Sequence, residues 1–249
     1  MYIRLILIAL LATVVSCRDF YSSTEKLLEK KDLAAVKKSA TREYRKDSTS
    51  LEALYFMYWA DLPEHPKATA ADTNKYLESF EQQYVKASTS PKGAPGASDS
   101  LRMRRFSRIF VSIALKYFYR NSFDAAIKWF QLAEGSFSGD AQFHALLASC
   151  YIMTRQNSDA IAHLRTVVDH LDPKDARSCY NLGCLYSLQS DTADAIGYLS
   201  MAIKLDPGYK AKMSSDADFD NIRSTSQFAA LQNAKSGSDS ATASGSGLE

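Results

Sequence analysis

The stretch "CYNLGCLYSLQSDTADAIGYLSMAIKLDP", residues 179–207, places small and apolar residues at helical intervals on both sides of a short polar segment. Leu182 and Gly183 fall on one face of its first half, and Ala195 and Leu199 fall on one face of its second half. Gly183 and Ala195 have almost no side chain, so two helices that face each other at these positions approach closely. The spacing therefore predicts a helix pair that is joined by a short polar turn.

The same frame recurs twice upstream, at steps of about 35 and about 34 residues, which are typical periods of helical repeat arrays. Copies in register predict a stack of helix pairs, because each pair buries its apolar face against the next. The middle copy has one extra residue before its closing proline. The matching positions are Leu147, Ala148, Tyr151, Ala160, Leu164 and Pro173 in the middle copy, and Ile113, Ala114, Tyr117, Ala126, Phe130 and Ala133 in the first copy.

The last copy resembles the tetratricopeptide repeat (TPR) in "YNLG" at 180–183, "DAI" at 194–196 and "LDP" at 205–207. Cys179 stands where the family has a large aromatic residue near the start of the first helix. The resemblance implies an all-α fold, a right-handed superhelix of stacked helix-turn-helix pairs, with an additional amino-terminal helical segment. It implies three repeat units at about 107–140, 141–175 and 176–209, within a repeat region at 101–209.

In the TPR family, the first helices of the pairs line a concave groove that binds partners. The family's groove positions fall here on Arg108, Val111, Leu115, Phe118, Tyr119, Gln142, Ala145, Ser149, Ile152, Met153, Arg177, Tyr180, Cys184, Ser187 and Leu188. The resemblance implies an apolar and aromatic floor with arginines at its edge. Such a surface suits a protein or peptide partner with an acidic end. The alternative is that Phe118, Tyr119 and Leu188 contact the chain's own amino-terminal helices.

The chain opens with "MYIRLILIALLATVVSC", in which one early cation precedes an apolar run that is too short to span a bilayer. This pattern predicts a signal peptide at residues 1–16. Its end, Val14-Val15-Ser16-Cys17, resembles the lipobox of bacterial lipoproteins, which implies acyl chains on Cys17 as a membrane anchor. Arg18 rather than Asp follows the cysteine, so we expect the outer membrane, and no acidic cluster follows to suggest the cell surface, so we expect the side facing the periplasm.

The remaining segments are assigned by pattern and composition. "DLAAVKKSA" at 32–40 followed by "SLEALYFMYW" at 50–59 has the element order of a degenerate repeat unit, although generic amphipathic helices give the same pattern. A segment rich in proline, glycine and serine predicts a linker, and the carboxy-terminal "GSGLE" resembles an expression scar. The assigned ranges are an amino-terminal helical region at 17–86, the linker at 87–100, a capping helix segment at 210–235 and a flexible tail at 236–249.

The sequence contains no arrangement of residues that indicates catalysis. A net charge of +2 lacks the basic excess of most nucleic-acid binders. Glycine-rich phosphate loops, GxSxG elbows and HExxH pairs are absent from the sequence. We therefore expect no enzyme, no nucleic acid and no cofactor, and we expect a membrane-anchored scaffold that binds partners during assembly or organisation of a cell-envelope complex.

A second hypothesis is a helical ligand- or metal-binding envelope protein, with a cavity between the amino-terminal helices and the repeats. His144, His163 and His170 are the residues on which a metal site can be imagined, but they lack the short-spaced ligand pairs of zinc sites. We expect no metal and place His144 in the core. Cys150, Cys179 and Cys184 are expected to be small buried residues, of which Cys184 is the groove-facing thiol to test.

Overall fold

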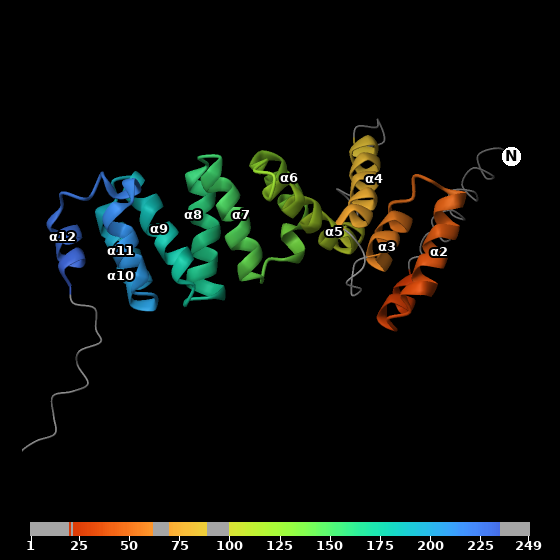
Figure 1. Cartoon of the computed structure of the whole chain (residues 1–249), viewed down its shortest axis with the longest axis horizontal. Coiled ribbons are helices and arrows are strands. Elements are labelled where there is room, and N and C mark those ends of the chain that lie inside the picture. Colours follow the sequence, from red (N-terminus) through yellow and green to blue (C-terminus); the bar gives the residue numbers. More distant parts are fainter. Residues whose placement is uncertain (1–19, 21, 62–69, 89–99, 235–249) are drawn as a thin grey trace, which may run out of the picture. The chain divides into compact units, whose positions relative to one another are not determined.

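The computed structural model describes residues 20, 22–61, 70–88 and 100–234, and these residues form helices and turns without a strand (Figure 1). The expected all-α fold of stacked helix-turn-helix pairs with additional amino-terminal helices is confirmed. The chain divides into two compact units, one of residues 1–116 with 129–136 and the other of 117–128 with 137–249. The expected signal peptide, Cys17, most of the linker and the tail lie outside the described residues.

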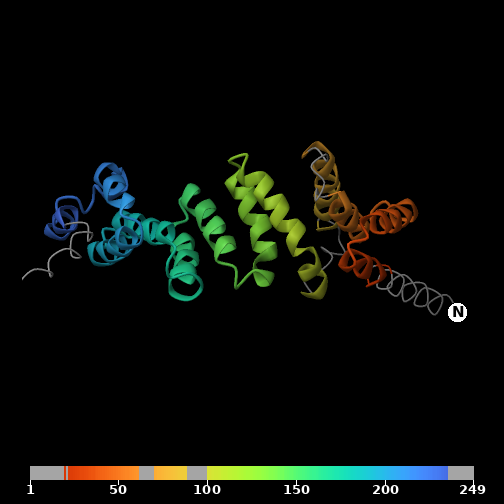
Figure 2. The same cartoon turned by 60° about the horizontal axis from the view of Figure 1, so that its bottom comes forward.

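The helices follow one another in a simple order. A helical segment at residues 22–29 precedes α2 (Leu33–Lys46), α3 (Leu51–Asp61), α4 (Ala70–Ser88), α5 (Ser100–Phe118), α6 (Phe123–Ala133), α7 (Ala141–Met153), α8 (Asn157–Thr166), α9 (Ala176–Leu188), α10 (Thr192–Leu205), α11 (Gly208–Ser215) and α12 (Ser226–Asn233). In the second unit α7 packs on α8, α8 on α9, and α9 on α10, as both views show (Figures 1 and 2). The helices of the last two copies therefore form one continuous stack.

Each pair turns at one residue in the left-handed conformation. Asn121, Arg155 and Ser190 have φ values of 57°, 60° and 60°. In each case this residue's N–H donates to the carbonyl three residues earlier, and the next N–H donates to the carbonyl five residues earlier. These bonds satisfy carbonyls that a helix end leaves unpaired. The repeated geometry explains why the three copies keep one register.

Gly183 marks the closest approach between the paired helices α9 and α10. A Cβ placed on Gly183 would lie 2.8 Å from Cγ of Leu199 and 3.4 Å from the carbonyl oxygen of Ala195. Leu199 and Ala195 are fully buried at this contact. The predicted close contact at Gly183 and Ala195 is confirmed.

The extra residue of the middle copy is absorbed inside a helix. After α8 the chain continues as a π-helical turn, η2 (Val167–Leu171), and the N–H of Asp172 donates to the carbonyl of Val167 at 2.7 Å. A π turn holds one more residue than an α turn over the same rise. The middle copy is therefore longer by one residue without a longer loop.

The first helix pair lies further upstream than the sequence pattern indicates. Lys31 has φ 57° and the same two turn bonds as the later copies, to Leu28 and Leu27. Seven residues before it, the buried Thr24 shares a hydrogen bond with Ser39 at 3.0 Å. The pair is thus residues 22–29 with α2, so α2 is a second helix. α2 also packs on α3, the helix with which the sequence pattern joins it in a degenerate unit.

An aromatic cluster forms the core of the first unit. Phe80 of α4 contacts Phe106 of α5, with ring centroids 5.2 Å apart, and Tyr84 contacts Phe110 at 5.2 Å. Trp129 of α6 completes the cluster against Tyr84 at 5.5 Å. Edge-to-face aromatic contacts of this kind stabilise a core beyond the area that they bury. This cluster fixes α4, α5 and the second half of α6 together.

We predict that Gly183→Ala destabilises the protein by about 1–3 kcal/mol, because the added methyl group must displace Leu199. The matched control is Gly197→Ala in the middle of α10, where a Cβ meets nothing within 4 Å. This control is expected to stabilise by about 0.5–1 kcal/mol, since alanine is the better helix former. Urea unfolding of both variants measures the difference. Equal midpoints for the two variants would contradict the close contact.

Candidate functional site

The groove positions of the first unit offer little open apolar surface. Arg108 is exposed, but its guanidinium lies over the Trp59 ring, 5.7 Å from the centroid. Val111 and Leu115 are half-buried. These three positions are therefore engaged within the first unit or only partly accessible.

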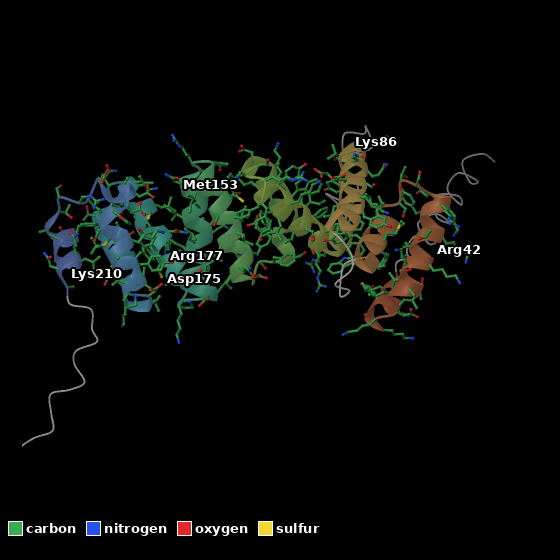
Figure 3. All side chains as sticks on the ribbon, viewed as in Figure 1. Arg42, Lys86, Met153, Asp175, Arg177 and Lys210 are labelled. Atoms are coloured by element: carbon green, nitrogen blue, oxygen red, sulfur yellow. The ribbon has the colours of Figure 1, made fainter. Side chains whose placement is uncertain are left out.

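Three large apolar side chains are exposed in the second unit at equivalent positions. Tyr119, Met153 and Leu188 each stand two residues before the left-handed turn residue, and they are 77%, 61% and 45% exposed. Large exposed side chains at one repeated position form a row along the ends of the first helices. We call Tyr119, Met153 and Leu188 the apolar row; Figure 3 shows Met153 at the end of α7.

Hollows flank the row on the surface of the second unit. One is lined by Met153 and Thr154 together with residues 121–125 at the start of α6. Another, of about 520 Å³, extends from the end of α7 over α9 to the carboxy-terminal segment, and its lining includes Ile152, Arg155, Leu188, Tyr180, Cys184, Lys212, Asp216 and Asp218. Gln142 is exposed and Phe118, Ala145, Ser149 and Ile152 are half-buried. The row therefore stands among depressions that a partner's side chains can enter.

The groove positions of the last copy are closed. Tyr180 and Ser187 are buried, with exposed fractions of 1% and 0%, and Cys184 is also buried. The expectation that these residues form an open floor is wrong. Only Arg177 and Leu188 of the five expected positions in this copy are exposed, and Figure 3 shows Arg177 at the start of α9.

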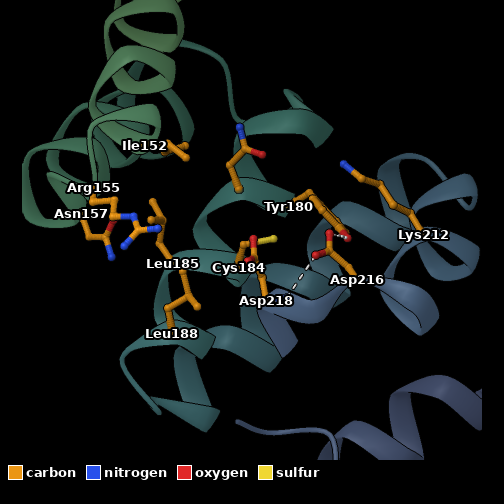
Figure 4. Close-up of a pocket in the computed structure, with 11 residues that line it drawn as sticks. Ile152, Arg155, Asn157, Tyr180, Cys184, Leu185, Leu188, Lys212, Asp216 and Asp218 are labelled. Carbon is orange, nitrogen blue, oxygen red and sulfur yellow. Dashed lines mark hydrogen bonds between the residues drawn. The ribbon is translucent and has the colours of Figure 1, made fainter. Parts of the chain in front are cut away.

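The carboxy-terminal segment, residues 208–223, covers this part of α9 (Figure 4). The hydroxyl of Tyr180 donates to Oδ2 of Asp216 at 2.7 Å, and the Tyr180 ring stacks on Tyr209 at 4.7 Å. The ammonium of Lys212 lies 4.2 Å from the centroid of the Tyr180 ring. Asn221 donates to the carbonyl of Ser187 at 3.3 Å. The aromatic ring of Tyr180 and its hydroxyl group thus both contact other residues of the chain.

Arg223 holds this cover in its folded form. Its guanidinium donates to the carbonyls of Ser214 and Asp216, each at 2.7 Å, and to the carboxylate of Asp220 at 3.1 Å. Phe219 and Phe228 are buried beneath it. The segment expected as a cap at 210–235 forms α11, a 3₁₀ turn (η3, Ala217–Phe219) and α12 in its described residues, and these contact α9 as well as α10.

A thiol and two carboxylates meet beneath this cover. Sγ of Cys184 and one oxygen each of Asp216 and Asp218 lie within 4.8 Å of one another, the one group of this kind among the described residues. Burial raises the pKa of Cys184, and both carboxylates raise it further. Burial likewise raises the pKa of Asp218, with Asp216 adding to the shift. The thiol therefore holds its proton, and Asp216 accepts the hydrogen bond of the Tyr180 hydroxyl group.

The other two described cysteines are also buried thiols. Cys150 and Cys179 are fully buried, and none of the three is in a disulfide. Burial raises the pKa of Cys150 to about 12. The expectation that the cysteines act as small buried residues is confirmed for all three.

The histidines pair with each other inside the middle copy. His144 is buried, and its Nε2–H donates to the carbonyl of Ser138 at 3.1 Å. This bond leaves Nδ1 of the neutral ring to accept from Nδ1–H of His163 at 2.8 Å. The expected core position of His144 with satisfied nitrogens is confirmed. His170 is exposed on the π turn.

No protein-family model matches the chain, and a comparison with curated protein sequences gives no match. Solved structures give matches of low identity. The crystal structure of MamA is 17% identical with a TM-score of 0.44, covering 76% of this chain and 96% of that one. YrrB, described as a TPR protein with an unusual peptide-binding site, is 14% identical with a TM-score of 0.48, covering 78% and 89%. PilF of Pseudomonas aeruginosa is 16% identical with a TM-score of 0.43, covering 81% and 98%. The fold assignment rests on the helix pairs themselves.

We predict that Tyr180→Phe loosens the cover, since it removes the hydroxyl that donates to Asp216. The expected loss is about 1–2 kcal/mol, because a buried carboxylate oxygen loses its donor. Hydrogen exchange in residues 208–223 should accelerate more than exchange in α7 and α8. Tyr209→Phe is the matched control, because the Tyr209 hydroxyl makes no hydrogen bond to the described residues and its ring stays stacked. Similar exchange in the two variants would contradict this role for Tyr180.

Proposed function

We propose that this chain is a membrane-anchored scaffold that holds protein or peptide partners on the apolar row, in the assembly or organisation of a cell-envelope complex. The observation that carries the proposal is the exposure of Tyr119, Met153 and Leu188 at one repeated position. A soluble domain gains nothing in stability from three exposed large apolar side chains, whereas a binding surface uses them as anchors.

The repeated placement favours an elongated partner. Successive row positions belong to successive helix pairs, so a peptide that follows the row meets one apolar anchor on each pair. Arg120 and Arg155, both exposed, stand beside the first two anchors. Guanidinium groups pair well with carboxylates, so the partner that fits has spaced apolar side chains and acidic groups between them.

The cover over α9 limits where such a partner binds. Tyr180, Cys184 and Ser187 are buried, and residues 208–223 cover part of the inner face of the last copy beside the remaining hollow. Leu188 of the row borders this cover, since its carbonyl accepts from Asn221 at 3.4 Å. A partner on the row therefore reaches the edge of the cover at Leu188.

The anchoring part of the proposal rests on the lipobox-like sequence that ends at Cys17. Within the part of the chain that the structure describes, no helix has the length and apolar character to cross a membrane. Acyl chains on Cys17 would hold the helix pairs at the membrane surface, facing the periplasm. A membrane-held scaffold meets its partners at one surface, which raises their effective concentration.

The row is tested by placing a photoreactive amino acid at Met153 and irradiating cells. We expect discrete crosslinked adducts from Met153, and loss of most of these adducts when Tyr119→Ser and Leu188→Ser are added, since each anchor contributes about 1–2 kcal/mol. The same amino acid at Met201 is the control, because Met201 is 40% exposed but stands on α10, away from the row. Adducts that form equally from Met201, or that persist without the two anchors, would refute binding at the row.

The anchor is tested by Cys17→Ser. We expect the variant to leave the membrane fraction or to accumulate with its signal peptide uncleaved, because no sulfur remains to be acylated. Fractionation and intact mass measure both outcomes, and Cys150→Ser is the control because Cys150 is buried in α7. A variant that is cleaved and still tightly membrane-bound would exclude anchoring through Cys17.

A further inference from the structure

One face of α2 is basic along its whole length. Lys37, Lys38, Arg42 and Arg45 are exposed, and together with Ala34 and Thr41 they line a shallow surface hollow. None of these six described lining residues is acidic. Figure 3 shows the Arg42 side chain extending outward from the helix. The face therefore presents cations over the length of α2 with only small side chains between them.

The helices around this face carry a surplus of positive charge. Residues 22–46 contain eight lysines and arginines against four acidic residues, a surplus of four.

The arrangement costs α2 some of its own stability. Lys38 and Arg42 are four residues apart, and Arg42 and Arg45 are three apart, so like charges lie beside each other on the helix. The helix dipole favours cations only in the last turn, which accounts for Arg45 and not for Lys38 or Arg42. An anionic surface outside the chain would relieve this repulsion.

We propose that the basic face of α2 binds the anionic phospholipid headgroups of the membrane to which the chain is attached. This inference rests on the proposed anchor at Cys17, which stands three residues before Phe20, a residue that is already helical. Three residues reach at most about 11 Å, so the first helix pair stays close to the bilayer. A polybasic surface beside a lipid anchor adds attraction to anionic headgroups.

The chemistry of the face fits headgroups rather than the bilayer interior. Between the cations it has only Ala34 and Thr41, so it lacks the large apolar side chains that insert among acyl chains. A helix of 14 residues is about 21 Å long and lies flat on a planar surface. Each cation near an anionic surface increases binding about five-fold, so Lys38, Arg42 and Arg45 together contribute on the order of a hundred-fold. Salt screens this attraction.

The test measures the accessibility of Ala34→Cys in the full chain. Ala34 is exposed at the amino-terminal end of the basic face, one turn before Lys37 and Lys38, and the three described cysteines are buried, so an uncharged maleimide reports on position 34 by peptide mapping. In vesicles of phosphatidylcholine with phosphatidylglycerol, we expect labelling to slow roughly ten-fold relative to phosphatidylcholine alone, and to recover at high salt. Adding Lys38→Gln, Arg42→Gln and Arg45→Gln should abolish the difference in labelling rate between the two kinds of vesicle. The matched control is Lys128→Gln, Lys174→Gln and Lys204→Gln, which removes three other exposed cations and should preserve it.

The possible outcomes distinguish headgroup binding by α2 from anchoring through Cys17. Flotation with phosphatidylcholine vesicles reports the anchor alone, because these vesicles carry no net charge. A chain that floats but labels equally in both kinds of vesicle keeps the anchor and refutes headgroup binding at α2. A chain that does not float on neutral vesicles, yet is protected on anionic ones, refutes the anchor and keeps the basic face. Protection by soluble polyglutamate that matches protection by vesicles would show an acidic polypeptide as the ligand and would overturn the proposal.

Discussion

The turn inside each helix pair passes through a single residue of positive φ, and the place of that residue sets the register of both helices. A residue other than glycine is strained there, and the two backbone hydrogen bonds to the preceding helix offset the strain. Counting seven residues back from each turn gives the small side chain at which the helices meet. These positions are Thr24, Ala114, Ala148 and Gly183, all buried. The distance between the two helices of a pair follows from this contact.

The regular spacing of small residues made the repeated helix pairs predictable from sequence. Gly183 and its counterparts recur because a close helix contact tolerates few residue types, so the pattern survives where other positions vary. The amino-terminal pair was harder to place. There, Thr24 stands at the contact where the later copies have alanine or glycine, and it reaches Ser39 through a hydrogen bond. Threonine at this position does not resemble the repeat, so the pattern indicated the helices and missed the pair that turns at Lys31.

The candidate site was predictable only where the repeat itself builds it. Tyr119, Met153 and Leu188 are exposed because their positions recur with the pairs. Tyr180 occupies a groove position of the same frame, yet it is buried by Tyr209, Lys212 and Asp216, which follow the last copy. Repeat spacing carries no information about such a contact. The acid-rich "DADFDNIR" at 216–223 was the one sequence signal of this contact, since a carboxylate accepts a hydrogen bond from a buried tyrosine hydroxyl group.

The wide turn after α8 shows how an array of this kind accommodates a change in length. Val167 and Val168 are neighbours in sequence and both are buried. The additional residue of this copy thus lies in a turn that contributes to the hydrophobic interior, and it lengthens no connection between helices. Length variation in such arrays need not accumulate in loops, and a deletion in this turn would remove core volume rather than surface.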